Sequence, residues 1–302
     1  MRIAFANVAG GRLVDDNNRY VDADQTHVFG TALAELQPDV LLVTELDCDS
    51  DQLERLAAAA MPGRAVHPPL SERFSNSHIP GVDRIGVGIA SSYPITDLGR
   101  IDLPDPPFEM LHWRTGEPLD WHAKGFVVAR LDLGEQGTVD IAAGQVCPVH
   151  MARSVDGVEY TYSEEPARSY GKEMTAHLAR ELEARGVRRL IVAGDLNMQN
   201  PRDFFTEQLG LVDGFSDPLP ATTPDGRSID RIFTSPSLAV GDVEVVRLAG
   251  ADHYPVGCQV TARPSQERAI GMIREQDLAR PKSGGPSRSG GARRGPTGRG
   301  PR

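Results

Sequence analysis

The sequence predicts an α+β sandwich, with β-sheets inside and helices on the outside. About ten strand-like and four or five helix-like segments follow one another in mixed order, without strict strand–helix alternation. The chain of 302 residues is long enough to bury a large core. Its 39% apolar and 25% charged residues are typical of a soluble globular protein.

The individual elements follow from periodicity and from the residues that end each run. Short apolar runs predict buried strands, and apolar residues three or four apart predict helices. The clearest helix, 165–185, carries apolar residues at four-residue steps from Tyr170 to Leu182. In chain order, we expect strands at 2–8, 40–45, 85–90, 125–133, 139–146, 187–193, 229–234, 243–248 and 256–261, and helices at 27–36, 51–60, 165–185 and 266–279.

Charge divides the chain into an acidic body and a basic end. Residues 280–302 contain seven basic residues and no acidic one, so the first 279 residues carry a formal charge of −17. The basic end is rich in Gly, Pro, Ser and Arg, which predicts a disordered, solubilising extension, with contact to nucleic acid as the alternative. The acidic body disfavours a protein that coats nucleic acid, because it repels a phosphate backbone at long range.

The sequence also bears on the cellular compartment. No run approaches the ~20 apolar residues of a membrane span, and the first seven residues lack the apolar core of a signal peptide. The three cysteines show no CxxC spacing, which argues against a disulfide framework and a cysteine zinc site. We therefore expect a cytoplasmic protein; its oligomeric state stays open.

Polar residues gather where the predicted strands begin or end. Function commonly lies on polar side chains held at the ends of a rigid scaffold, so these residues predict one site assembled from distant parts of the chain. Their carboxylate and amide oxygens, without cysteine, suit a hard cation such as Mg²⁺. The set consists of Asn7, Glu45, Asp195, Asn197, Asp230, Asp252 and His253.

Two parts of this set have a specific chemistry. Asp195 and Asn197 point the same way from one strand-end turn, so they can address one water and one phosphate together. His253 follows Asp252 directly, and Asp230 across the strands would hold its ring in one tautomer with a raised pKa. The alternative for Asp230 is a surface ion pair with its neighbour Arg231. The six histidines other than 150 and 253 show no ligand-like spacing and are expected to be structural.

Six segments, in this order, resemble the endonuclease/exonuclease/phosphatase superfamily, which has the DNase I-like fold. The segments are 3–8, 42–46, 88–95, 194–197 (Gly-Asp-Leu-Asn), 228–233 and 252–256 (Asp-His-Tyr-Pro-Val). The resemblance covers roughly residues 1–262 and implies a four-layer α/β/β/α sandwich. It divides the chain into a catalytic domain 1–262, a C-terminal helix 263–279 and the basic tail 280–302.

The resemblance implies a role for each residue in hydrolysis that depends on Mg²⁺, or on Mn²⁺ in its place. Glu45 would be the main metal ligand, Asn7 would lie beside it, and Asp252 would complete the metal site. Asn197 would hold the phosphate. Residue 195 would orient or deprotonate the attacking water. Residue 253 would stabilise or protonate phosphoryl oxygens, or serve as the base, oriented by residue 230; the base stays open because the two titrations can be coupled.

The sequence departs from the family pattern at the end of the strand 139–146, where a histidine is usual. By length, Gln145 stands in that place, and His150 lies five residues later. Either a bulge brings His150 into the site, or Gln145 replaces it as a neutral donor that supplies neither charge nor proton. We expect His150 to be catalytic and Gln145 to contact the substrate.

These observations predict a phosphodiesterase or nuclease, with nucleic acid among its substrates and the basic tail as a second contact to it. One alternative is a phosphomonoesterase for a small metabolite or a lipid headgroup. That activity would need a closed pocket in the loops 72–83, 102–119 and 152–166. The other alternative is a non-catalytic binding protein of the same fold.

Overall fold

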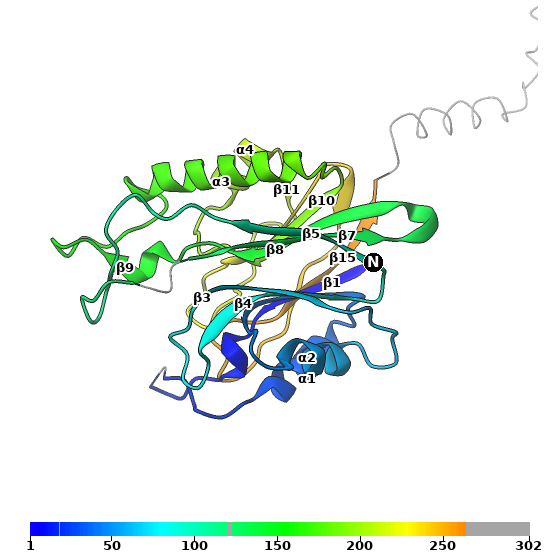
Figure 1. Ribbon diagram of the computed structural model, residues 1–302, viewed down its shortest axis with the longest axis horizontal. Coiled ribbons are helices and arrows are strands. Elements are labelled where there is room, and N and C mark those ends of the chain that lie inside the picture. The colour runs from blue at the N-terminus through cyan, green and yellow to red at the C-terminus, as the bar shows by residue number, and fades with distance from the viewer. Residues whose placement is uncertain (18, 120–122, 264–302) are drawn as a thin grey trace, which may run out of the picture. The chain divides into compact units, whose positions relative to one another are not determined.

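Two β-sheets lie face to face in the middle of the molecule, and helices cover their outer faces (Figure 1). This architecture comes from a computed structural model that describes residues 1–263 except 18 and 120–122. Residues 1–263 form one unit. The four-layer α/β/β/α arrangement confirms the fold class that the sequence predicts.

The first sheet has the strand order β13-β15-β1-β2-β4-β3, with β14 paired to β15. The two strands β1 and β2 run parallel, and the other pairs are antiparallel. Its strands are β1 (Arg2–Asn7), β2 (Val40–Asp47), β3 (Leu70–Asn76), β4 (Arg84–Ser91), β13 (Leu238–Val240), β14 (Glu244–Val245) and β15 (Val256–Ala262).

The second sheet has the order β11-β12-β10-β8-β7-β5, in which only β8 and β10 run parallel among the described pairs. Its strands are β5 (Ile95–Asp102), β7 (Gly125–Asp132), β8 (Thr138–Gln145), β10 (Leu190–Asp195), β11 (Val212–Asp213) and β12 (Asp230–Thr234). A small separate pair joins β6 (Leu111–His112) to β9 (Ala152–Arg153).

Helices α1 (Thr26–Glu35) and α2 (Gln52–Ala60) cover the first sheet, and α3 (Ala167–Ala184) and α4 (Arg202–Leu209) cover the second (Figure 1). Short 3₁₀ turns lie at η1 (Ala9–Gly11), η2 (Gly134–Gln136) and η3 (Val149–Met151). No helix in the described part of the chain is both long and apolar enough to span a membrane.

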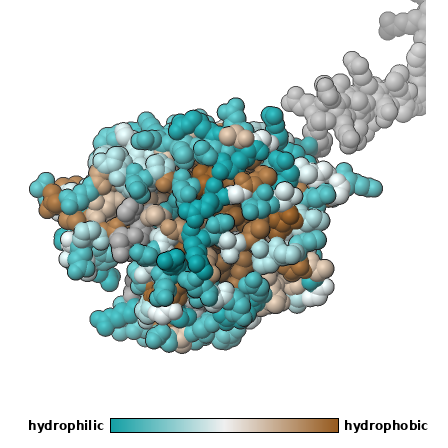
Figure 2. Space-filling model, in the orientation of Figure 1, coloured by the Kyte–Doolittle hydropathy of each residue, from teal (hydrophilic) through white to brown (hydrophobic). Residues whose placement is uncertain are grey.

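Both faces of β2 are buried, which explains its unbroken apolar run. Val40 and Leu42 belong to the core between the sheets, whereas Leu41 and Val43 pack toward α1 and α2. This is the two-residue alternation of a strand with a core on either side. Figure 2 shows hydrophobic residues along the middle of one face, at the level of the two sheets.

The predicted elements are found, with some corrections. The strand expected at 243–248 is only Glu244–Val245. The sequence did not reveal α4, the strands β3 and β5, or the short strands β6, β9, β11 and β13. Both β3 and β5 lie at sheet edges, where exposed polar residues break the apolar run. The helix expected at 266–279 and the tail 280–302 lie outside the described residues.

Candidate active site

The ends of the central strands of both sheets meet across the sandwich. Asn7 ends β1, and its Nδ2 donates a hydrogen bond of 3.2 Å to Oδ2 of Asp195 at the end of β10. Gln145 ends β8, and its Nε2 donates to Oε1 of Glu45 on β2 at 2.7 Å. Within the second sheet, Asp195 pairs in register with Gln145 on one side and Asp230 on the other. The strand-end residues therefore form one buried cluster, as their positions in the sequence predict.

A β-bulge directs Glu45 into this cluster. The register between β2 and β4 shifts between Thr44 and Leu46, and Glu45 has a φ of 49°. Without the bulge, strand alternation would place Glu45 on the helix side with Val43. Leu46 takes that side instead, and Glu45 lies buried beside Gln145. A positive φ at a bulky residue costs free energy, and such strain is concentrated at functional sites.

Asp195 is the most heavily hydrogen-bonded carboxylate of the cluster. Its Oδ2 accepts from Asn7 and, at 3.0 Å, from Gln145, and its Oδ1 accepts from the backbone N–H of Asn197 at 3.1 Å. Burial raises its pKa to about 6, against the charge of His253, which lowers it. The same turn places the amide of Asn197 at the site, where its Nδ2 donates to the carbonyl oxygen of Val146 at 2.9 Å.

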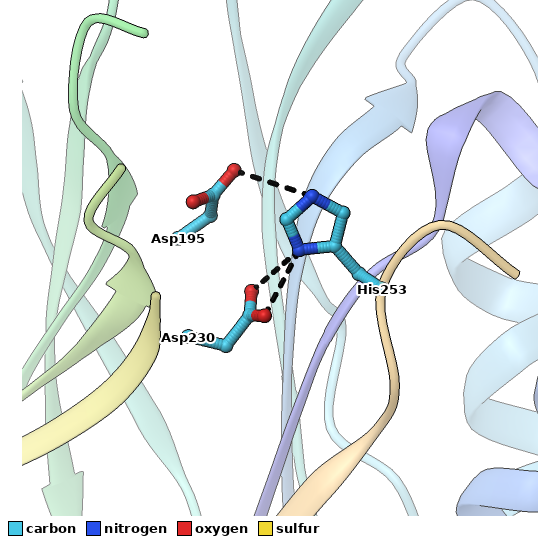
Figure 3. Close-up of side chains that lie close together, drawn as sticks. All are labelled: Asp195, Asp230 and His253. Atoms are coloured by element: carbon cyan, nitrogen blue, oxygen red, sulfur yellow. Dashed lines mark hydrogen bonds and ion pairs between the residues drawn. The ribbon is translucent and has the colours of Figure 1, made fainter. Parts of the chain in front are cut away.

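His253 lies between two aspartates (Figure 3). Its Nδ1 donates to the carboxylate of Asp230 at 2.9 and 3.0 Å, and its Nε2 lies 3.9 Å from Oδ2 of Asp195. Burial opposes a charge on the ring, but Asp230 and Asp195 outweigh it and raise the pKa of His253 well above its usual value. One atom from each of the three residues lies within 4.8 Å of the others, so they could also hold a metal ion. The surface ion pair considered for Asp230 does not form, because Asp230 is fully buried and faces His253.

Asp252 presents a buried oxygen to the cluster. Its Oδ2 accepts a hydrogen bond of 2.8 Å from the hydroxyl of Tyr20. Its Oδ1 is buried and has no hydrogen-bond partner among the described residues. Burial, together with the charge of Glu45, raises the pKa of Asp252 above its usual range. A buried carboxylate oxygen without a donor, next to other carboxylates, fits a cation ligand.

The charges of the cluster also fit a divalent cation. Four carboxylates meet here, and the groups beside them that can carry positive charge are His253, the buried Lys124 and His78. Burial would raise the pKa of Glu45, yet the charge of Lys124 and then of His78 holds it below its usual value. The excess negative charge and the oxygen donors are those that Mg²⁺ prefers. The four acids are Glu45, Asp195 and Asp230, which are buried, and Asp252, which is half-buried.

Gln145 and His150 both reach the site, in different places. Gln145 lies between Glu45 and Asp195 and donates to both. His150, in η3, lines a pocket together with Asn197, and its Nε2 lies 3.1 Å from Nη1 of Arg227. Burial and the charge of Arg227 lower the pKa of His150 to about 4, so it is neutral near pH 7.

Sequence reasoning missed four residues that border the site. Lys124 and His78 act electrostatically on Glu45, Tyr20 binds Asp252, and Arg227 contacts His150. The prediction that His78 is only structural missed its place beside Tyr20, with ring centroids 5.8 Å apart, and near Glu45. All four lie outside the strands, where no periodic pattern signals their position.

Residues 4–265 match the model of the Endonuclease/Exonuclease/phosphatase family. The chain belongs to this family. Its members are in general phosphoesterases and nucleases. No curated protein matches the chain in a comparison of sequences.

Solved structures of the family share the fold. A Beutenbergia cavernae endonuclease/exonuclease/phosphatase is 17% identical with a TM-score of 0.59, over 87% of this chain and 71% of its own. The human Nocturnin catalytic domain is 16% identical with a TM-score of 0.52, over 87% and 93%. A Bacteroides thetaiotaomicron mannosyl-6-phosphatase is 14% identical with a TM-score of 0.50, over 86% and 99%. At these identities the likeness concerns the fold.

Proposed function

We propose that the protein is a phosphoesterase that depends on a divalent cation, Mg²⁺ or Mn²⁺. The observation that carries the proposal is the excess of buried carboxylates at the meeting strand ends, with an unpartnered oxygen on Asp252 among the described residues. Glu45, Asn7 and Asp252 would hold the ion. Bound there, it would neutralise charge on a phosphoryl oxygen and on the leaving oxygen.

The chain's own residues would supply the proton transfer and the remaining phosphate contacts. Asp230 fixes the ring of His253 through Nδ1, which leaves Nε2 to donate toward a phosphoryl oxygen. Because the pKa of His253 is raised well above its usual value, we assign it the role of donor. Asp195, with a pKa of about 6, is ionised near pH 7 and suits the role of general base. Asn197 would bind a second phosphoryl oxygen.

The charge of the molecule favours small phosphoesters over long nucleic acid. Residues 1–263 contain 23 basic and 39 acidic residues, a formal charge of −16. Such a body repels a polyanion at long range. The mannosyl-6-phosphatase of the same fold supports a small phosphoester as substrate. A nuclease remains the second candidate, favoured by the basic end of the chain.

The test is hydrolysis of p-nitrophenyl phosphate, bis(p-nitrophenyl) phosphate and labelled single- and double-stranded DNA. Each is assayed with Mg²⁺, Mn²⁺ or EDTA, for the wild type and for Asp195→Asn and His253→Ala. We expect metal-dependent hydrolysis that both substitutions strongly reduce. A folded wild type that binds no Mg²⁺ and hydrolyses none of these substrates would overturn the proposal and indicate a non-catalytic binding protein.

A further inference from the structure

A buried lysine lies beside the candidate active site and has no part in the reaction proposed above. Lys124 directly precedes β7 and is only 4% exposed. Its carbonyl oxygen accepts a hydrogen bond of 3.0 Å from the backbone N–H of Leu103, and its Nζ donates one of 3.5 Å to the hydroxyl of Ser75 on β3. Burial of an ammonium group costs free energy unless carboxylates compensate its charge. Such a position therefore requires negative charge nearby.

The negative charge comes from the acids of the candidate active site. Lys124 lines a small cavity together with Gln145, whose Nε2 donates to Glu45 at 2.7 Å. Burial lowers the pKa of Lys124, whereas Glu45 and, less strongly, Asp195 favour its charged form. Conversely, burial would raise the pKa of Glu45, and Lys124 is the strongest of the groups that lower it. The ammonium group therefore acts directly on the acid that we propose as the main metal ligand.

His253 is a second cation of the cluster and is bound to other acids. Its Nδ1 donates to Asp230 at 2.9 and 3.0 Å, and its Nε2 lies 3.9 Å from Oδ2 of Asp195. Burial opposes a charge on the ring, but these carboxylates raise its pKa well above the usual value. The three residues could hold an ion of their own, yet the protonated ring already offsets the charge of both carboxylates. A metal ion at this position would be repelled by the ring.

The charges of the site then match one divalent ion. Among the described residues, four carboxylates face the two cations Lys124 and His253, so two negative charges remain. His78 adds no charge near pH 7, because burial lowers its pKa below the usual value. Many phosphatases and nucleases hold two metal ions about 3.5–4 Å apart. Two divalent ions would bring twice the charge that remains here.

We propose that the ammonium group of Lys124 takes the place of a second metal ion, so that the site binds one divalent cation. Its fixed charge would offset the carboxylates and favour the negative charge of a phosphate nearby, as a second ion would. This role rests on the proposed phosphoesterase function and specifies how its site is charged. Because Lys124 acts through Glu45 and the bound ion, it is a positioning residue.

Titration with Mn²⁺ at pH 8, above the pKa of about 6 of Asp195, tests this role. Isothermal calorimetry counts the ions, and we expect one per wild-type chain. Lys124→Met keeps the length of the side chain but removes a charge that repels the ion, so Mn²⁺ should bind at least about tenfold more tightly. At saturating Mn²⁺, kcat for bis(p-nitrophenyl) phosphate should fall at least about tenfold, because the site has lost positive charge that stabilises the transition state.

The opposite directions of these two changes separate an effect of charge from a loss of structure, since a distorted site would weaken binding and slow hydrolysis together. Lys124→Arg keeps a positive charge and should bind Mn²⁺ within about threefold of wild type. Lys172→Met, at an exposed position on α3, is the matched control and should change neither quantity. Urea unfolding without metal shows whether each variant is folded.

Two Mn²⁺ ions per wild-type chain would overturn the inference about Lys124, as would equal or weaker binding of Mn²⁺ by a folded Lys124→Met. Both results would leave the phosphoesterase function standing. If Lys124→Met does not fold, the count for the wild type still decides, because one ion supports the inference and two overturn it. A wild type that binds no Mn²⁺ and hydrolyses no phosphate ester would instead contradict the proposed function, and the inference would fail with it.

Discussion

Asp230 and Arg231 are neighbours on β12, and both are completely buried. Arg231 belongs to a group whose charges balance, whereas Asp230 belongs to a cluster in which carboxylates outnumber cations. Strand alternation directs their side chains to opposite faces of the sheet. Arg231 pairs with Asp213 and lies over the ring of Phe215, with 4.7 Å between guanidinium carbon and ring centroid. Asp230 faces the cluster of the candidate active site and binds His253.

The group around Arg231 is balanced in charge. Asp213 also accepts a hydrogen bond of 2.7 Å from Nε of Arg202, which in turn contacts Asp217. We call these four residues, two arginines and two aspartates, the ion-pair group. A buried charge with a partner is compatible with folding, whereas removal of that partner leaves an uncompensated charge.

The cluster of the candidate active site is not balanced in this way. Its four carboxylates outnumber the neighbouring cations, and burial raises the pKa of Asp195 and Asp252. Carboxylates held together at a cost in folding free energy are typical of sites that bind a cation or move a proton. Asp213 and Asp217 therefore stabilise the fold, whereas we propose that the acids of the cluster serve the reaction.

The largest effect should come from the proposed base. Asp195→Asn preserves the shape of the side chain but cannot accept a proton, so we expect kcat to fall by about 10²- to 10⁴-fold. The stability of the folded state should change little, because the loss of one of the mutually repelling carboxylates is offset by an amide NH₂ that faces hydrogen-bond donors. Hydrolysis of bis(p-nitrophenyl) phosphate and urea unfolding measure the two effects. Asp217→Asn, an exposed member of the ion-pair group, is the control; a loss below tenfold in Asp195→Asn would assign the base to His253.

A substitution in the ion-pair group should instead lower the stability of the folded protein. Asp213→Ala leaves the buried guanidinium of Arg231 without its carboxylate, so we expect the free energy of unfolding to fall by about 3–5 kcal/mol. Asp217→Ala removes an exposed acid and should cost at most about 1 kcal/mol. Urea unfolding measures both changes. Equal stability of the two variants would show that the charge of Arg231 is compensated elsewhere.

Mg²⁺ should stabilise the folded protein by binding to the cluster of the candidate active site and not to the ion-pair group. At a concentration 100-fold above its dissociation constant, the ion should raise the free energy of unfolding by about 2.7 kcal/mol. Asp252→Asn should lose this stabilisation, since it removes a carboxylate whose Oδ1 is proposed to bind the ion. Asp217→Ala should retain it. Thermal melting with Mg²⁺ or EDTA provides the measurement, and an unchanged shift in Asp252→Asn would remove that residue from the metal site.

The layers of the fold and most members of the cluster could be predicted from sequence because both are encoded locally. An apolar run such as 40–43 indicates a strand buried on both faces, and the polar residue that follows it marks the strand end. Parallel pairing of β1 with β2 and of β8 with β10 then brings such ends to the same edges.

The features of the site that could not be predicted from sequence depend on tertiary structure. The direction of Glu45 is set by a bulge in the pairing of β2 with β4, which a single strand's sequence does not reveal. Tyr20 and Lys124 reach the cluster from segments outside the strands. The partner of Arg231 is Asp213, 18 positions away, and not its neighbour Asp230, which was the alternative considered from the sequence. Contacts of this kind follow from packing between elements and carry no periodic signal.

The smallest predicted effect concerns the contact between His150 and Arg227. Arg227 is paired with Asp225, and the imidazole of His150 stays neutral. Because the pKa of His150 is about 4 in the folded protein and about 6.5 when unfolded, the unfolded chain binds more protons between these values. The stability contributed by the neutral ring is therefore complete above pH 6.5 and is lost as the pH falls toward 4. Arg227→Gln removes the nearby charge and should raise this pKa by about one unit, or about 1.4 kcal/mol.

An NMR titration of the His150 ring measures this shift directly. The control is Arg180→Gln, an exposed arginine on α3, which should leave the titration of His150 unchanged. A wild-type pKa near 6.5 would contradict the prediction, because it would mean that the ring is solvated and gains a proton as readily as in the unfolded chain. A lowered pKa that Arg227→Gln does not alter would assign the shift to burial alone. His150 would then be kept neutral by packing alone, unlike the ion-pair group, whose charges are compensated by charged partners.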